Sequence, residues 1–483
     1  MPAILGTRRA LIVLSLAALF FLYFFGLDRA GMMGPDEPRY ASIGREMANS
    51  GDWVTPRLDG HPWFEKPALL YWMTAVGFKL GLGDDLAPRL PVAVLSVAFL
   101  VFYFVMLRRE FGEAAAAFST CILATSAGWL AYSHVGVTDL PVAACFSAAM
   151  LLLLGSAAIR RSAETSGSGL RFQVQTEPPA SPFHRIQIAA GILLGLAVLA
   201  KGLGPLVLFL PAIWFLRKFP RTIAITLGTA FVVSSPWYIL ATLRNGPAFL
   251  QELIIQHHVE RFLTGNDMHA RPWWFFLPVI LAGMFPWTPT LALLFRKPLY
   301  ADLRVRFLLA WFAFGFVFFS VSAGKLPGYL LPLLPALAAL CGIALTQASN
   351  PRWVLALSAA LLWLIPAIQD LLPRALVAGL GNTPIQIPTL LLLPTAVLAV
   401  ICWYFQREKS VSIVALFVIL GVSRVVWETY PLLDRTYSAR AFWRAQVDAG
   451  AANQLCLEQA NRSWRYGLDY YAHRPIPDCK QGH

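Results

Sequence analysis

The stretch LIVLSLAALFFLYFFGLDRAGMMGPDEPRYA, residues 11–41, decides the class of this protein. In it, an apolar run long enough to enter a bilayer is followed by two adjacent carboxylates, Asp36 and Glu37. Carboxylates beside a hydrocarbon layer are costly unless they face water or perform chemistry. The stretch therefore predicts a membrane anchor followed by a polar site at the membrane surface.

The composition extends this interpretation to the whole chain. Hydrophobic residues form 57% of the 483 residues, charged residues form only 13%, and the mean hydropathy is +0.60. A soluble globular chain has about twice that charged fraction. We therefore predict an all-α integral membrane protein.

Apolar runs recur along the chain at the length that a hydrocarbon core of about 30 Å requires. We predict thirteen spans, at 10–27, 88–107, 114–132, 140–159, 187–201, 203–216, 222–241, 273–295, 307–322, 328–346, 353–369, 387–405 and 411–427. The fifth and sixth are short and flank Lys201 and Gly202, so they are either two spans or one hairpin that does not fully cross. One span fewer would move every later loop to the other side.

Basic residues give the orientation, because cytoplasmic loops are enriched in lysine and arginine. Arg8 and Arg9 precede the first run, which has no small-residue cleavage site, so we interpret it as an anchor with a cytoplasmic N-terminus. If the loops alternate between the two sides of the membrane over thirteen spans, the short loops that carry basic clusters lie in the cytoplasm. The net charge of +13 fits an inner surface against anionic lipid and requires no nucleic acid.

This topology divides the chain into a transmembrane domain, 1–427, and an outer (periplasmic) C-terminal tail, 428–483. The transmembrane domain contains a first outer loop at 28–87 and another outer loop at 242–272. A cytoplasmic loop at 160–186 is poor in hydrophobic residues and rich in Ser, Gly and Pro, which predicts flexibility. The chain thus places two long, polar segments and the tail on the outer face.

The first outer loop and the tail each carry further signals. Apolar residues at helical spacing predict one interfacial helix after Pro38, and a second is predicted over 67–80. Cys456 and Cys479 are the only cysteines of the tail, and an oxidising exterior favours a disulfide between them. The tail has about 55 residues, which makes a marginal independent core.

Asp36 and Asp139 are far apart in sequence, but the topology places both at outer ends of spans. They are therefore expected to face one cavity. Asp36 is equally a residue type that forms a turn before Pro38, and Thr138-Asp139-Leu140-Pro141 is a good helix N-terminus. The capping and functional interpretations of Asp139 are compatible.

Four cations share this outer face: Arg39, Lys66, Arg261 and Lys325. A single such residue is usually a lipid anchor whose charged end reaches the interface. Four of them, interleaved with carboxylates, favour an anionic phosphate ligand.

A metal site is the alternative for part of this set. Glu65 with His257, His258 or His269 offers ligands that suit zinc, although no HExxH or comparable spacing is present. Glycine-rich phosphate loops and a nucleophile elbow are absent as well, so nucleotide binding is unsupported. An enzyme of this kind would need a donor that arrives already activated within the membrane.

The motifs together resemble a known family. GPDEPRYASIGREM, DWVTPRLDGHPWFEKPALLYW, VTDLP, LAKGLGP, HHVERF and KLPGYLLPLLP occur in that order between about residues 8 and 346. They resemble the aminoarabinose transferase and protein mannosyltransferase group of GT-C glycosyltransferases (glycosyltransferase family 39-like). The resemblance implies transfer of a sugar from a polyprenyl (undecaprenyl) phosphate donor to an acceptor on the outer face of the cell inner membrane.

The resemblance also implies roles for individual residues. Asp36 matches the catalytic acidic residue, Asp139 a second essential carboxylate, Lys66 a phosphate contact, and Arg39 and Tyr40 the wall of the site. The remaining assignments from the resemblance are Arg261 as a second phosphate-binding arginine, Glu65 and His258 as a metal pair, and Tyr329 as a tyrosine near the first Asp. Lys325, one of the four outer cations, and Glu37, the neighbour of Asp36, are predicted as further substrate contacts from their positions in the chain. The tail is shorter than is usual in the aminoarabinose branch, and Trp63 stands where an aromatic hydroxyl is common, so the acceptor stays open.

We expect a single displacement in which Asp36 accepts the acceptor proton while Lys66, with Arg261 or Arg39, stabilises the departing phosphate. This scheme requires no cofactor, and a divalent metal is optional. The acceptor would be lipid A, another glycan or a protein. A transporter or flippase of a lipid-linked anion is the alternative function, and a structural subunit would leave the charged residues unexplained.

Overall fold

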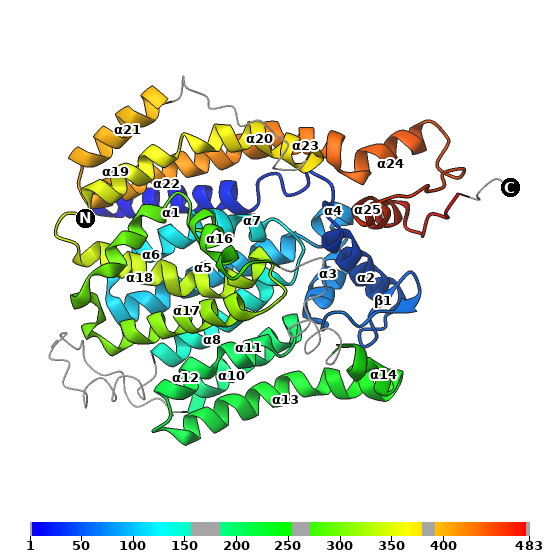
Figure 1. The fold of residues 1–483 in the computed structure, drawn as a ribbon, viewed down its shortest axis with the longest axis horizontal. Coiled ribbons are helices and arrows are strands. Elements are labelled where there is room, and N and C mark those ends of the chain that lie inside the picture. Colours follow the sequence, from blue (N-terminus) through cyan, green and yellow to red (C-terminus); the bar gives the residue numbers. More distant parts are fainter. Residues whose placement is uncertain (1, 156–183, 254–270, 379–391, 480–483) are drawn as a thin grey trace.

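The structure, a computed structural model, describes residues 2–155, 184–253, 271–378 and 392–479. These residues are mostly helical, and their regular β-structure is one short antiparallel hairpin of β1 (Arg57–Leu58) and β2 (His61–Pro62). Figure 1 shows the long helices gathered in one bundle, with the hairpin and the C-terminal helices at one end of it. The predicted all-α class is confirmed.

The bundle contains helices of very different lengths. In chain order they are α1 (Pro2–Tyr23), α5 (Leu90–Phe111), α6 (Glu113–Ala124), α7 (Ala127–Ser133), α8 (Asp139–Leu154), α10 (His184–Lys201), α11 (Gly204–Leu208), α12 (Leu210–Phe215), α13 (Pro220–Asn245), η2 (Trp273–Phe275), α16 (Phe276–Gly283), η3 (Thr288–Phe295), η4 (Lys297–Ala301), α17 (Leu303–Val321), η5 (Pro327–Leu333), α18 (Leu334–Gln347), α19 (Arg352–Leu361), α20 (Leu364–Ala378), α21 (Leu392–Tyr404), α22 (Arg407–Arg424) and η8 (Val425–Thr429).

Among the described residues, seven helices are long and apolar enough to cross a membrane, or up to nine if each of two bent pairs is one span. The bent pairs are α6 with α7, at 60°, and η2–α16 with η3, at 112°. Four further apolar helices are shorter: Val13–Tyr23, Asp139–Leu154, Gly204–Phe215 and Leu392–Tyr404. The protein is therefore multi-spanning, and the count of thirteen stays a prediction.

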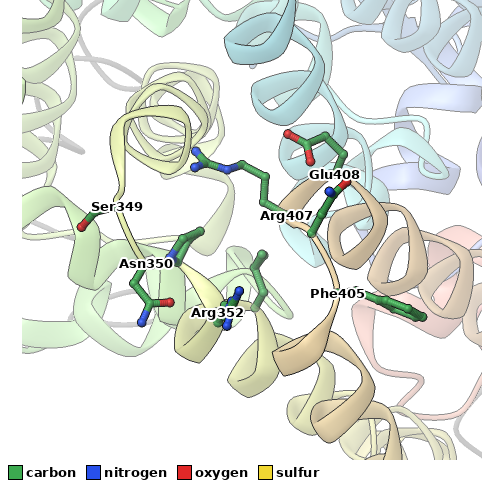
Figure 2. A pocket seen from close by; sticks show the side chains of 9 residues that line it. Ser349, Asn350, Arg352, Phe405, Arg407 and Glu408 are labelled. Carbon is green, nitrogen blue, oxygen red and sulfur yellow. The ribbon is translucent and has the colours of Figure 1, made fainter.

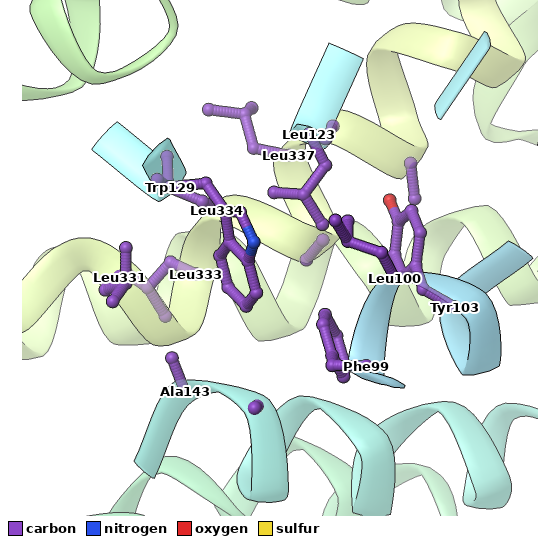
Figure 3. Packing of buried hydrophobic residues seen from close by; sticks show 14 of the residues in the cluster. Phe99, Leu100, Tyr103, Leu123, Trp129, Ala143, Leu331, Leu333, Leu334 and Leu337 are labelled. Carbon is purple, nitrogen blue, oxygen red and sulfur yellow. The ribbon is translucent and has the colours of Figure 1, made fainter. Parts of the chain in front are cut away.

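The centre of the bundle is the run from η5 to α18, which is almost fully buried. Leucines of this run pack around Phe99, Tyr103 and Trp129, which come from α5 and α7 (Figure 3). Gly342 of α18 faces Ser119 of α6 so closely that an added Cβ would collide with the serine Oγ. Small residues at such contacts let apolar helices approach, which is how helices associate where lipid competes for their side chains.

At one end of the bundle, the first outer loop folds into α2 (Asp36–Ser50), the β-hairpin, α3 (Leu69–Lys79) and the short α4 (Gly83–Leu86). Both predicted interfacial helices exist within two residues of their expected starts. Tyr40, Ile43 and Met47, which share one face of α2, are at most 3% exposed. That face holds the loop on the bundle, and α2 ends at Gly51, whose φ of +72° suits glycine at a helix C-terminus.

The tail is joined to this loop instead of forming a core of its own. It contains α23 (Tyr430–Tyr437), α24 (Ala439–Asp448) and α25 (Arg462–Ala472), and α25 packs on α2. Leu468 and Tyr470 of α25 share one apolar cluster with Met32 and Ala41 of the loop. The remaining short helix of the outer segments is α14 (Pro247–Leu250).

Covalent and ionic contacts fix the position of the tail. Cys456 and Cys479 form the predicted disulfide, with Cα atoms 4.8 Å apart. Arg440 lies 2.7 Å from Asp85 of the loop, and Tyr471 donates a hydrogen bond to the same carboxylate at 2.9 Å. A tail with a marginal core of its own is thus cross-linked internally and bound to the neighbouring loop.

Candidate active site

The first two residues of α2 are both acidic, and the geometry of the helix points their side chains in different directions. Asp36 and Glu37 are the first two residues of this helix, and Pro38 is the third. Proline is tolerated there because a first-turn amide has no partner within the helix, and first-turn carboxylates complement the helix dipole. Successive residues of an α-helix point about 100° apart, so the two carboxylates face different surroundings.

Asp36 faces the accessible side of α2. Its side chain is 50% exposed, and Oδ1 accepts a hydrogen bond from Arg39 Nη2 at 2.6 Å. The same nitrogen lies 2.9 Å from Glu65 Oε2, and Lys66 Nζ lies 3.3 Å from the other oxygen of Glu65. Carboxylates and cations therefore alternate in a chain, Asp36–Arg39–Glu65–Lys66, which we call the Arg39 cluster.

Arg39 is the buried member of the Arg39 cluster, with 3% of the residue exposed. Its guanidinium carbon lies 5.3 Å, 5.4 Å and 5.5 Å from the rings of Tyr40, Trp63 and Tyr466. Burial alone would lower the pKa of Arg39, but neighbouring groups, Glu65 foremost, raise it, so the residue stays charged. Its Nε has no hydrogen-bond partner among the described residues, and an oxygen of a bound ligand would satisfy it.

Glu37 points into the protein. It is 2% exposed, and its oxygens accept hydrogen bonds from Arg89 Nε and Nη2 at 2.7 Å each and from the amide of Gly136 at 2.9 Å. Arg89 donates further to three backbone carbonyls within residues 27–31. We call this the Arg89 cluster. The substrate contact expected for Glu37 is replaced by a structural role, because its carboxylate is enclosed in a bidentate ion pair.

Asp139 and Lys201 form a second polar pair. Asp139 begins α8, Lys201 ends α10, and Lys201 Nζ donates to Asp139 Oδ1 at 2.5 Å. The ammonium lies 5.0 Å from the ring centre of Tyr329. A Cβ on Gly328 would collide with Asp139 Oδ1, so the KLPGY turn needs glycine to approach the carboxylate this closely. Thr138 is the N-cap residue of α8, and its side chain makes no capping hydrogen bond.

Two observations place Asp139 near Asp36, as the sequence predicted. Tyr132 lies within electrostatic range of both carboxylates. In addition, Gly136, three residues before Asp139, contacts Glu37, the neighbour of Asp36. The start of α2 and the start of α8 therefore meet, and both ion pairs belong to one polar region.

Lys325, another predicted phosphate ligand, is 5% exposed. Its ammonium donates to the carbonyls of Ser322 and Arg271. Burial lowers the pKa of Lys325. These contacts give Lys325 a role in fixing the loop before η5, next to Tyr329, whose ring packs on Phe319 at 5.4 Å.

Residues 254–270, the histidine-rich part of the outer loop 242–272, lie outside the described residues. Arg261, His257, His258 and His269 all belong to it, so their predicted roles stay predictions. Glu65, the other expected metal ligand, has a cation within 3.3 Å of each oxygen, and its role as a metal ligand also stays a prediction. In the described part of the chain, no group of three or more His, Cys, Asp or Glu side chains is arranged to hold a metal.

A cavity of about 390 Å³ lies at the opposite end of the bundle, between the α18–α19 and α21–α22 connections (Figure 2). Arg352, Asn350 and Glu408 are among its lining residues. Arg407 also lines it but donates to the last carbonyls of α18, at 2.6 Å for Thr346. Arg407 of this cavity thus serves the end of α18, and the Arg39 cluster, which holds the predicted site residues, remains the candidate site.

Three residues of this region were missed by sequence reasoning. Lys201 was noted only as a break between spans, Arg89 as part of no motif, and Tyr466 not at all. Lys201 had a signal, since LAKGLGP puts a cation at the end of an apolar run. Arg89 and Tyr466 lie 52 and 427 positions from Glu37 and Arg39, the residues they contact, and the sequence carries no sign of those pairings.

Comparison with known proteins supports the GT-C resemblance. Residues 65–170 match the family model described as dolichyl-phosphate-mannose-protein mannosyltransferase. An undecaprenyl phosphate-alpha-4-amino-4-deoxy-L-arabinose arabinosyl transferase of Pseudomonas fluorescens is 31% identical over 71% of this chain and 57% of its own length. The corresponding transferase of Aeromonas salmonicida is 30% identical over 67% of this chain and 58% of its own length. The chain spans less than two thirds of these relatives.

A solved structure extends the similarity to the whole fold. ArnT from Cupriavidus metallidurans, crystallised with undecaprenyl phosphate, superimposes with a TM-score of 0.77 and 27% identity. The superposition covers 97% of this chain and 85% of that one. The bundle, the first outer loop and the tail therefore all have counterparts in a single known architecture.

Proposed function

We propose that the chain is a GT-C protein of the aminoarabinose transferase group and, on that premise, a membrane glycosyltransferase that uses a polyprenyl-phosphate-linked sugar. The acceptor is a hydroxyl or phosphate group on the outer face of the cell inner membrane. The observation that carries the proposal is the Arg39 cluster. It presents a half-exposed carboxylate, Asp36, next to fixed positive charge at the end of an apolar bundle.

This arrangement suits displacement at a sugar carbon. The acceptor oxygen bonds to the anomeric carbon while its proton passes to Asp36, and the bond from that carbon to the donor phosphate oxygen breaks. The electron pair of the broken bond stays on the phosphate, so charge grows there and needs cations, not an acid. Arg39 donates to one oxygen of Asp36 and so orients the carboxylate, as a proton acceptor requires.

Lys66 is our first choice for the donor phosphate. Its ammonium lies just before α3, at 14% side-chain exposure, and the lipid tail of the donor requires the phosphate to lie at headgroup depth. Arg261 is proposed as the second phosphate ligand. Asp139, held by Lys201 beneath Tyr329, is proposed to position the sugar.

We propose that the reaction needs no cofactor. The two cations beside Glu65 disfavour a divalent ion at that carboxylate. Phosphate departure requires positive charge, and Lys66 and Arg39 supply it. A chelator should therefore leave turnover unchanged, whereas a role for Glu65 with His258 would make turnover sensitive to it.

The thirteen-span topology remains our proposal for the membrane arrangement. Seven long helices, two bent pairs and four shorter apolar helices of the described residues each coincide with one predicted span. The N-terminus would be cytoplasmic and the tail periplasmic, since the tail packs on the first outer loop. A reporter fused after His483 tests this orientation, because cytoplasmic activity of the reporter contradicts an odd number of spans.

The deciding experiment supplies purified protein with radiolabelled undecaprenyl phosphate-linked aminoarabinose. Envelope membranes from a strain that lacks the protein serve as the acceptor. Label in the lipid A, glycan or protein fraction identifies the acceptor class, and an Asp36→Asn variant is the control. Label that crosses proteoliposomes without forming a new product would favour a flippase instead, and absence of both outcomes would overturn the proposal.

A further inference from the structure

The tail helix α25 lies alongside α2, the helix that carries Asp36 and Arg39 (Figure 1). Two arginine–tyrosine contacts mark this packing. The Arg45 guanidinium lies 4.5 Å from the ring centre of Tyr470, and Arg39 lies 5.5 Å from that of Tyr466. The tyrosines are one helical turn apart, so α25 presents both on the face that meets α2.

The two tyrosines differ in burial and in the contacts that they make. Tyr470 is fully buried, and its hydroxyl donates to the carbonyl of Asp84, so it is committed to holding the tail in place. Tyr466 is only partly buried. Its ring contacts the same arginine that binds the half-exposed Asp36, and the exposed Arg462 lies 5.9 Å from the ring centre. Tyr466 therefore borders the accessible side of the site.

Tyr466 is also held rigidly enough to shape a site. The disulfide Cys456–Cys479 closes the segment that contains α25, and Asn461 caps the start of this helix by accepting a hydrogen bond at 3.0 Å. Trp63, another aromatic neighbour of Arg39, lies 5.4 Å from the guanidinium, and its Nε1 is buried without a partner among the described residues. Tyr466 lies on a helix and Trp63 in the loop just after β2, and a ring on a helix gives a binding wall more precision than a ring on a loop.

The position of Tyr466 and Trp63 relative to the bundle indicates which substrate they contact. A polyprenyl phosphate donor approaches from the apolar bundle, where Lys66 lies before α3, and α3 packs on α5 and α10. The tail helix packs on α2 and α24, beyond the loop and away from those helices. The tail helix thus lies beside the helix that carries the half-exposed Asp36, and this is the side that we assign to an acceptor from the outer face.

We propose that Tyr466 of the tail is an acceptor-positioning residue, so that the tail forms the acceptor side of the active site. The inference rests on the proposed glycosyl transfer. Aromatic faces bind sugar rings and cations through their apolar surface and quadrupole. Tyr466 would orient the incoming acceptor over Asp36 and take no part in holding the donor phosphate.

Two activities of one preparation test this role. The first is transfer from undecaprenyl phosphate-linked aminoarabinose to envelope membranes of a deletion strain, measured over a range of membrane amounts. The second is hydrolysis of the same donor without acceptor membranes. Tyr466→Ala should raise the half-saturating amount of membranes about tenfold and leave donor KM and hydrolysis within about twofold. Tyr466→Phe should retain most of the acceptor binding, because it keeps the ring.

Phe442→Ala is the matched control, because Phe442 is an exposed tail aromatic that contacts Trp464 and no residue of the Arg39 cluster. It should leave both activities unchanged. A parallel fall of transfer and hydrolysis in Tyr466→Ala, or an unchanged half-saturating amount, would overturn the inference. Should Tyr466→Ala not fold, Tyr466→Leu, which removes the aromatic ring but keeps an apolar side chain, replaces it with the same expected result. Wild-type protein with neither activity would contradict the proposed function itself.

Discussion

Arg39 and Arg89 are both buried arginines bound to carboxylates from the first turn of α2, yet only one of them borders an accessible surface. Arg89 has both oxygens of Glu37 and three carbonyls as partners, all of them enclosed. Arg39 shares Asp36, which is half exposed, and keeps one donor without a partner among the described residues. A buried charge with complete partners holds a fold together, whereas one with an open position can bind something else.

The difference extends to the shape of each cluster. In the Arg89 cluster every group comes from the chain around α1, α2, α5 and the turn before α8, and the geometry is bidentate. The Arg39 cluster is linear, and its walls come from segments as distant as Trp63 and Tyr466. Substitutions in the first should therefore affect stability, and those in the second should affect turnover.

The largest expected effect is on folding. Arg89→Ala leaves the carboxylate of Glu37 buried without its counter-ion, and loss of one partner of a buried ion pair costs about 3 to 5 kcal/mol. That is a large part of the stability of a typical protein domain, so we expect little monodisperse protein in detergent. Size-exclusion chromatography and thermal unfolding measure it. Arg39→Ala should remain folded but inactive, and the two clusters would be equivalent if both variants behaved alike.

Asp36→Asn should give the next largest effect, on turnover alone. Removing a positioned proton acceptor lowers the rate by about 100-fold or more. The variant should unfold at the wild-type temperature, because the side-chain oxygen of the introduced asparagine can still accept the hydrogen bond from Arg39. Glu37→Gln is the matched neighbour and should lose stability more than rate. Wild-type turnover in folded Asp36→Asn protein would remove Asp36 from the mechanism.

Removing the charge of Lys66, the last residue of the Arg39 cluster, should reduce turnover. Lys66→Ala should lose about 2 to 4 kcal/mol of transition-state stabilisation, the scale for one group that stabilises developing negative charge. Lys66→Arg should keep part of the activity because the charge remains. Steady-state kinetics with varied donor separate affinity from turnover. If Lys66→Ala weakened only acceptor binding, the phosphate role would move to Arg261.

The sequence predicted the class and much of the site for physical reasons that are local. Apolar run length is a direct consequence of bilayer thickness, so the helices of the bundle were predictable. The disulfide followed from the only two cysteines in one outer segment. Asp36, Arg39, Glu65 and Lys66 lie in two short motifs, and these motifs do meet.

The parts that the sequence did not predict depend on long-range contacts. Asp36 and Glu37 are adjacent and chemically similar, so only the helix rotation shows that one is accessible and the other structural. Asp139 binds Lys201 across 62 positions. The tail was predicted to have a marginal core of its own, but Met32 and Tyr470 share one cluster that joins it to the first outer loop.

The smallest expected effect concerns the pH dependence of the local stability of the tail, which packs Tyr466 against the Arg39 cluster. Asp469 lies on α25 one turn from Tyr466 and accepts a hydrogen bond from the amide of Ile476 at 2.8 Å. Burial raises the pKa of Asp469 to about 6, with Asp59 and Asp478 adding to the effect and Arg465 opposing it. An unfolded aspartate has a pKa of about 3.9.

Between these two pKa values the folded tail binds more protons than the unfolded tail, so its stability falls as the pH rises from about 4 to about 6. Amide exchange in 462–479, corrected for the intrinsic pH dependence of exchange, should therefore show less protection at about pH 7 than at about pH 4.5. Asp469→Asn keeps an acceptor for Ile476 without a charge, so it should restore protection at neutral pH and abolish the trend. The exchange of amides around Arg89 should not follow this titration, because that cluster is closed without Asp469. If the amides of the tail and those around Arg89 followed the same titration, the tail and the bundle would unfold as one unit. The proposed difference between the enclosed Arg89 cluster and the Arg39 cluster, whose wall comes from the tail, would then be wrong.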